Sequence, residues 1–137
     1  MTDIRSVDHI QLPIPPRASP AARAFYQGLL GLREVRHPEL DRPGVLRFSL
    51  GWQRLDLSEG LYTGVAPQAH LALLVVGVER LADALEAAGH RVDRSAFTDQ
   101  RVYVEDPFGN RIELIEPPPQ SFDLPIPRHV QDLHLSV

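Results

Sequence analysis

Cysteine is absent from this 137-residue sequence, as are long apolar runs and a leader pattern at the start. Without cysteine, the chain can form no disulfide bond, thiolate metal site or cysteine nucleophile. No stretch approaches the roughly 20 apolar residues of a membrane-spanning helix. The opening MTDIRSVDHIQ has no signal-peptide pattern. We therefore expect a cytoplasmic protein that does not bind membranes.

Basic clusters are also missing, and the formal net charge is −4 at pH 7. Because nucleic acids are bound mainly through basic patches on phosphates, this charge pattern argues against a nucleic-acid partner. The apolar fraction of 43% and the charged fraction of 23% are those of a globular protein. The length suits a single domain that spans residues 1–137. Small molecules or protein partners are the expected ligands.

What the chain does contain is one order of elements that occurs twice. Short alternating or apolar runs bounded by proline and glycine indicate strands, and apolar residues at helical spacing indicate one helix in each half. The expected elements of the first half are strand 7–12, helix 19–30 and strands 32–36, 45–50 and 53–58. Those of the second half are strand 71–76, helix 78–88 and strands 90–94, 101–105 and 111–116.

Glycine punctuation supports an internal duplication. Gly31 and Gly89 end the two helices and are 58 residues apart (89 − 31), as are Gly51 and Gly109 in the last hairpin turns (109 − 51). We expect two β-α-β-β-β modules at about 5–60 and 68–117, followed by a tail at 118–137. Helix 19–30 is expected to start with Ser19 as its N-cap.

The most informative stretch is the final hairpin, RVYVEDPFGNRIELIEPP. The DPFG tetrapeptide that begins at Asp106 has the residues of a type I turn. In the strand that follows, Ile112 and Leu114 point one way, while Arg111 and Glu113 point the other. A carboxylate that lines a cavity needs a cation or a shifted pKa, whereas on a solvated face it needs neither. Arg111 could pair with Glu113 or receive an anionic substrate, but a surface position is the simpler interpretation.

Each half offers one imidazole early and one carboxylate late: His9 and Asp56, then His70 and Glu113. Two histidines with one or two carboxylates suit a divalent Mn, Fe, Co, Ni or Zn ion. Each residue also has a plain structural alternative. The histidines could be hydrogen-bonded core residues, and Asp56 could be a solvated strand residue.

The motifs VDHIQLPI, ARAFYQGLLGL, His70 before LALLVV, and YVEDPFGNRIELIE resemble the vicinal oxygen chelate superfamily over residues 5–117. This superfamily includes glyoxalases, bleomycin-resistance proteins and extradiol dioxygenases. The resemblance implies an α+β fold in which two βαβββ modules form an open, curved mixed sheet around a cavity. It also implies a homodimer.

The resemblance further implies metal ligands from the first, fourth, fifth and eighth strands, which are His9, Asp56, His70 and Glu113 here. Members with three ligands do not use the fourth-strand position, and Asp56 is shorter than the glutamate of glyoxalase I. We therefore expect His9, His70 and Glu113 to hold the metal. Glu113 and Asp56 are the expected catalytic carboxylates, with Asp56 as a candidate base.

Four functions follow from these residues. The first is a metal-dependent enzyme with glyoxalase-like lyase or isomerase chemistry on a small substrate that bears adjacent oxygens. The second is a metal-free protein of the bleomycin-resistance type that sequesters a drug or metabolite. The third is an extradiol-dioxygenase-like enzyme, and the fourth is an accessory domain with a decayed site. A further metal site from His129 and His134 in the tail is disfavoured.

Overall fold

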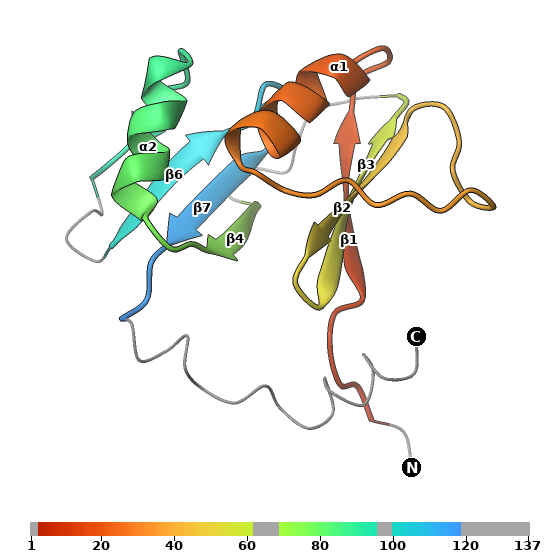
Figure 1. Cartoon of the computed structure of the whole chain (residues 1–137), viewed down its shortest axis with the longest axis horizontal. Coiled ribbons are helices and arrows are strands. Elements are labelled where there is room, and N and C mark those ends of the chain that lie inside the picture. Colours follow the sequence, from red (N-terminus) through yellow and green to blue (C-terminus); the bar gives the residue numbers. More distant parts are fainter. Residues whose placement is uncertain (1–2, 62–68, 96–99, 119–137) are drawn as a thin grey trace.

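A computed structural model of the chain describes residues 3–61, 69–95 and 100–118. The chain folds into two small mixed sheets with their helices (Figure 1), which confirms the predicted α+β class. The elements are β1 (His9–Ile14), α1 (Ser19–Ala22), the π-helix η1 (Arg23–Leu29), β2 (Val45–Leu50), β3 (Gln53–Glu59), β4 (His70–Leu74), α2 (Val78–Ala87), β5 (Val92–Asp93), β6 (Arg101–Glu105) and β7 (Arg111–Ile115). Most of the predicted tail, with His129 and His134, lies outside the described residues.

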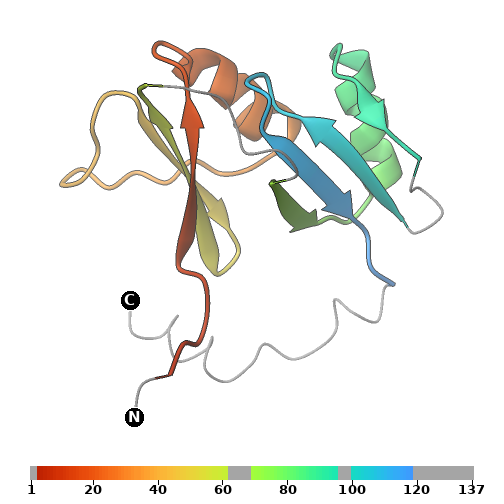
Figure 2. The same ribbon diagram turned by 180° about the vertical axis from the view of Figure 1, so that it is seen from behind.

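The two sheets repeat one topology. The first has the strand order β1-β3-β2 and the second β4-β7-β6-β5. In each sheet the first strand runs parallel to the last one, and the last one forms an antiparallel hairpin with its predecessor. Figures 1 and 2 show both helices on one side of the sheets. Among the described residues, no helix is long and apolar enough to cross a membrane.

Two predicted strands are shorter than expected. Segment 32–36 makes only one isolated bridge, Glu34 with Phe48, because Pro38 and the turn around it soon carry the chain away from β2. In segment 90–94 only β5 forms. The backbone N–H of His90 still donates to Leu85 O at the end of α2, so the strand cannot begin there.

The start of the first helix also differs from the prediction. Ser19 is not the N-cap but the first helical residue, and Ala18 precedes it without a side-chain cap. The Ser19 hydroxyl and backbone N–H instead donate to the carboxylate of Glu59, which also accepts from Arg17 N at 2.7 Å. A carboxylate from the end of β3 thus does the work of a cap.

The second module repeats this device. Glu116, just after β7, accepts from Gly77 N at 3.0 Å and from Val78 N at 2.9 Å at the start of α2. Glu59 and Glu116 are 57 residues apart (116 − 59). In both modules the end of the last strand therefore fixes the N-terminus of the helix that covers the sheet.

One apolar core joins the two modules on the helix side of the sheets. Its large, fully buried members come from both halves: Ile14, Phe25, Tyr26, Leu46, Phe48, Leu55, Leu57, Leu85, Ile112 and Leu114. Burying such side chains contributes about 1.5–3 kcal/mol each. The core also contains buried polar groups. The Tyr26 hydroxyl of η1 donates to Asp106 Oδ2 in the β6–β7 turn, at 2.7 Å.

Asp106 is the centre of that turn. It accepts from the backbone N–H groups of Phe108 and Asn110 at 2.9 and 2.8 Å, and from Asn110 Nδ2 at 2.8 Å. Asn110 Nδ2 also reaches the carbonyl of Pro13 in β1, at 3.4 Å. Burial, followed by the charge of Asp106, raises the pKa of Tyr26 far above its usual range, so the hydroxyl remains a donor. The turn therefore links module two to both η1 and β1.

We expect Asp106→Ala to lower the free energy of unfolding by about 2–4 kcal/mol, because it leaves a buried hydroxyl and several N–H donors without an acceptor. Tyr26→Phe, which removes one donor, should cost about 1–2 kcal/mol. Urea denaturation measures both values. Asp83→Ala on the surface of α2 is the control and should change stability by less than about 0.5 kcal/mol. A similarly small effect of Asp106→Ala would contradict the proposed role of this carboxylate.

The pH dependence of stability should reveal the carboxylate caps. The Val78 and Gly77 N–H groups lower the pKa of Glu116 below its ordinary value of 4.5. A carboxylate with a lowered folded-state pKa stabilises the protein above its unfolded-state pKa, and this stabilisation disappears as the pH falls through the folded-state value. Glu116→Gln should therefore be less stable than wild type at pH 7, and the difference should vanish in acid.

Denaturation midpoints of both proteins, measured from pH 7 to about pH 3, test this expectation. Glu39→Gln, a substitution at an exposed residue, serves as the control. A difference between Glu116→Gln and wild type that stays constant across the whole range would rule out the charge as its cause.

Candidate metal and substrate site

The candidate site residues lie on the sheet faces that point away from the helices. Glu113 is paired in register with Tyr103 on β6 and Ala72 on β4, and Asp56 with Arg47 on β2 and Gln11 on β1. Because side chains alternate along a strand, the apolar neighbours of both carboxylates enter the core on the opposite face. The predicted orientation of Glu113 away from Ile112 and Leu114 is thus observed.

Module two holds the more developed half of the site. The Glu113 side chain is only 6% exposed although its face is polar, because His70 and Arg101 cover it. His70 Nε2 lies 3.1 Å from Glu113 Oε1, and Arg101 Nη1 donates to Oε2 at 2.8 Å. Both carboxylate oxygens are therefore engaged. The Tyr103 ring lies beside this group, edge to face with His70 at a centroid distance of 6.1 Å.

The spacing of His70 and Glu113 suits a shared metal ion. Two cis ligand atoms that each lie about 2.0–2.2 Å from one ion are about 2.8–3.1 Å apart in octahedral geometry and about 3.3–3.6 Å apart in tetrahedral geometry. The observed 3.1 Å is at the upper end of the octahedral interval, although a direct pair of imidazole and carboxylate has the same spacing. An imidazole nitrogen and a carboxylate oxygen are also the correct donors for a transition-metal ion.

Module one presents the equivalent residues in a different state. Asp56 is buried, and Arg54 donates to both of its oxygens, at 2.7 and 3.0 Å. His9 Nε2 lies 4.0 Å from Asp56 Oδ2, while its Nδ1 is 2.7 Å from the carboxylate of Asp8. The arginine binds both oxygens of Asp56, so this half resembles an ion pair more than a metal ligand set.

The structure brings the predicted residues together in two pairs rather than in one group. Within residues 3–61, 69–95 and 100–118, no three histidine, aspartate or glutamate side chains are close enough to hold one ion. His9 therefore accompanies Asp56, and His70 accompanies Glu113. One chain places two of the three expected ligands side by side, and the third belongs to the other module.

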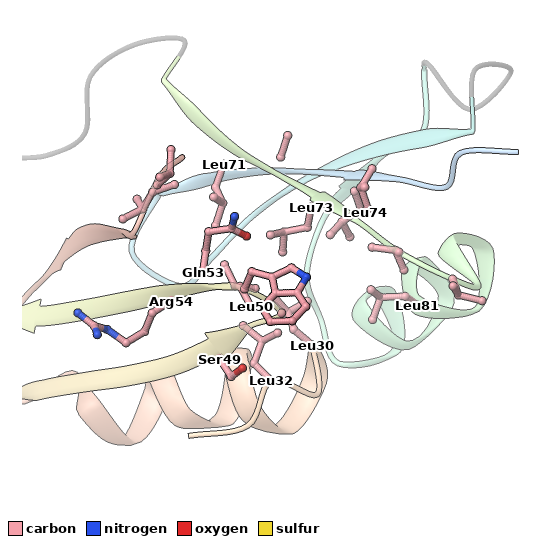
Figure 3. Close-up of a pocket in the computed structure, with 18 of the residues that line it drawn as sticks. Leu30, Leu32, Ser49, Leu50, Gln53, Arg54, Leu71, Leu73, Leu74 and Leu81 are labelled. Carbon is pink, nitrogen blue, oxygen red and sulfur yellow. The ribbon is translucent and has the colours of Figure 1, made fainter. Parts of the chain in front are cut away.

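An apolar cleft of about 930 Å³ lies between the two modules. Figure 3 shows leucines of β4 on one wall and Leu30, Leu32 and Leu50 on the other. Leu81 lies toward one end of the cleft and Arg54 toward the other. The outer edges of β1 and β4, which carry the two histidines, are unpaired in the described part of the chain. Several apolar side chains at these edges are exposed: Val7, Ile10, Leu74 and Val76.

The sequence reasoning missed the two arginines that bind the carboxylates, Arg54 and Arg101. A signal for both was present. Arg54 precedes Asp56 by two residues on one strand face. Arg101 pairs with Ile115 across the final hairpin, so counting back from the turn at Asp106 places it on the face of Glu113.

Comparison with known proteins now identifies the family. The profile of the Glyoxalase/Bleomycin resistance protein/Dioxygenase superfamily matches residues 6–114, and the chain belongs to this superfamily. This confirms the resemblance inferred from the motifs. No curated protein sequence matches the chain.

Solved structures agree with this assignment. A protein from Bacillus anthracis, described as belonging to the glyoxalase family, is 33% identical with a TM-score of 0.73, over 86% of this chain and 99% of the other. A lactoylglutathione lyase from Agrobacterium tumefaciens is 24% identical, with a TM-score of 0.63 over 84% and 96% of the two chains. TnmS3, an antibiotic-binding protein from Streptomyces sp. CB03234, is 23% identical, with a TM-score of 0.66 over 86% and 100%. The last two comparisons show the shared fold.

Proposed function

We propose that this protein is a metal-dependent enzyme that performs glyoxalase-like lyase or isomerase chemistry on a small substrate with adjacent oxygens. The observation that carries the proposal is the spacing of 3.1 Å between His70 Nε2 and the nearly buried Glu113. A buried carboxylate with an imidazole and an arginine around it is a costly arrangement to maintain without a function. His9, His70 and Glu113 are the ligands in this proposal, and the ion is Ni, Zn, Fe, Mn or Co.

A second copy of the chain would supply the missing ligand. His9 lies on β1 and His70 on β4, and the outer edge of each strand is open among the described residues. Open strand edges with exposed apolar side chains are favourable places for another chain to pair. In the proposed homodimer, β1 of one protomer approaches β4 of its partner. His9 of one copy then joins the His70–Glu113 pair of the other.

When bound, such an ion acts as a Lewis acid toward the oxygens of the substrate. The residues of this chain have separate tasks. Arg101 positions Glu113 through the contact at 2.8 Å. Asp56 is the candidate base. Arg54 donates to both of its oxygens and would hold this carboxylate in a fixed orientation.

A second candidate function is sequestration of a drug or metabolite without a metal. The apolar cleft of about 930 Å³ supports it, because that volume would accommodate a drug-sized molecule. In this alternative the drug or metabolite occupies the space between β1 and β4, and the histidines bind no metal. The antibiotic-binding protein TnmS3 has the same fold. Metal analysis separates the two candidates.

We expect protein purified without chelators to contain about one equivalent of a divalent transition metal per chain. His9→Ala, His70→Ala and Glu113→Gln should each lose most of it, because each removes one of three protein ligands. Elemental analysis by mass spectrometry measures the content. His37→Ala, at an exposed histidine outside the strands, is the matched control and should retain the metal.

Protein that lacks metal even after addition of each ion would contradict the proposed enzyme. A metabolite screen by thermal shift, with the same three variants, then tests sequestration. Stabilisation by an apolar ligand that is equal in wild type and in all three variants would establish the second function instead.

Mixed dimers test where His9 acts. A His9→Ala copy and a Glu113→Gln copy, each with its own affinity tag, are co-expressed and the mixed dimer is isolated. If the site is shared between chains, one of its two sites is intact, and we expect about half of the wild-type metal content. If each site lies within one chain, both sites are damaged and the metal is lost.

The control is a mixed dimer of His70→Ala and Glu113→Gln copies. These two ligands come from the same chain in either arrangement, so this dimer should contain almost no metal. Equal metal contents in the two mixed dimers would contradict the shared site, and sedimentation would show whether the chains associate at all.

A further inference from the structure

The two modules treat equivalent arginines differently. Arg54 lies opposite His9 in the β1–β3 pairing, and Arg111 lies opposite His70 in the β4–β7 pairing. Each arginine precedes the carboxylate of its module, Asp56 or Glu113, by two residues. Arg54 binds its carboxylate through two hydrogen bonds, whereas Arg111 makes no ion pair among the described residues.

The difference arises from an additional arginine in module two. Arg101 on β6 lies opposite Ile115, and the equivalent pairing in module one is Val45 with Ser58. Arg101 and His70 contact the two oxygens of Glu113, and this carboxylate forms no ion pair with Arg111 among the described residues. Of the two arginines of module two, Arg101 and Arg111, only Arg101 binds Glu113 among the described residues.

The guanidinium of Arg111 has a defined position. Its central carbon lies 4.2 Å from the centroid of the Tyr103 ring, which forms a cation–π contact. The ring is also the edge-to-face neighbour of His70. A stacked guanidinium keeps the N–H groups at its rim available for bidentate bonds to a planar or tetrahedral oxyanion. Tyr103 thus holds Arg111 beside the pair formed by His70 and Glu113.

Two carboxylates near Arg111 could compete with such an anion. Glu105 lies opposite Arg111 in the hairpin, but the two form no ion pair in the described part of the chain. Asp93 is bound by Ser95, whose backbone N–H donates at 2.9 Å. This bond is the main cause of the lowered pKa of Asp93, and the charge of Arg111 adds a smaller contribution. Among the described residues, neither carboxylate forms an ion pair with the Arg111 guanidinium.

We propose that Arg111, stacked on Tyr103, binds an oxyanion of the substrate, either a carboxylate or a phosphate-type group. The inference deepens the proposed function, on which it rests, by naming an anionic substrate class. It also assigns the two arginines of module two separate tasks. Arg101 holds the protein carboxylate, and Arg111 holds the charge of the substrate next to the proposed ion.

Titration of the metal-free full chain with inorganic phosphate, and separately with acetate, tests the proposal at constant ionic strength. Two-dimensional NMR of the backbone amides reports the dissociation constant and the residues affected. We expect saturable shifts around Tyr103 and Arg111, and at least about tenfold weaker binding in Arg111→Gln. Arg42→Gln, which removes an exposed arginine of module one, is the matched control and should bind as wild type does.

Comparison of the two anions shows whether the group is a carboxylate or a phosphate, and neutral acetamide should not bind. Arg111→Lys should bind the anion less tightly than wild type, because lysine retains the charge but lacks the planar N–H groups that form bidentate hydrogen bonds. Absence of saturable binding, or equal affinity in wild type and Arg111→Gln, would overturn the proposal. The metal content of Arg111→Gln is measured in parallel. An Arg111→Gln variant that keeps the metal but loses anion binding supports this inference. Wild-type protein that contains no metal would contradict only the proposed enzyme.

Discussion

The carboxylate of Asp106 is the constraint that holds the two modules in one body. It closes the final hairpin turn through Phe108 and Asn110, and it accepts the hydroxyl of Tyr26 from the helix of the other module. A buried carboxylate with several donors is far more favourable than one with none, so the turn and η1 depend on each other. The direction of β7, and with it the place of Glu113, follows from this turn.

The duplication supplies two equivalent scaffolds, and a few side chains make them chemically different. Glu59 and Glu116 perform the same structural task at the helix starts. Asp56 and Glu113 do not, because a bidentate arginine holds the first, while an imidazole and a second arginine hold the other. The two modules therefore share one topology but differ in the partners of this carboxylate.

Much of the fold could be predicted because its signals are local. Alternation in 111–115, helical spacing in 78–87 and glycines at positive φ, such as Gly31 and Gly89, identified the elements and the repeat. The prediction of a full strand at 32–36 was wrong, because the pairing of this segment depends on how soon the chain leaves β2. The prediction of Ser19 as an N-cap was also wrong. Its hydroxyl donates to Glu59, which lies 40 residues further along the chain and is not visible in the local sequence pattern.

By itself the sequence determined the family, the two-module α+β fold and the face on which Glu113 lies, because strand alternation and turn chemistry act within a few residues. Only the tertiary structure decided which partners the polar side chains find. In the folded chain, His70 and Arg101 contact Glu113, and Arg54 binds Asp56. Arg111 stacks on the ring of Tyr103. These contacts join strands that are distant along the chain, and their choice depends on register and on distances of a few ångströms.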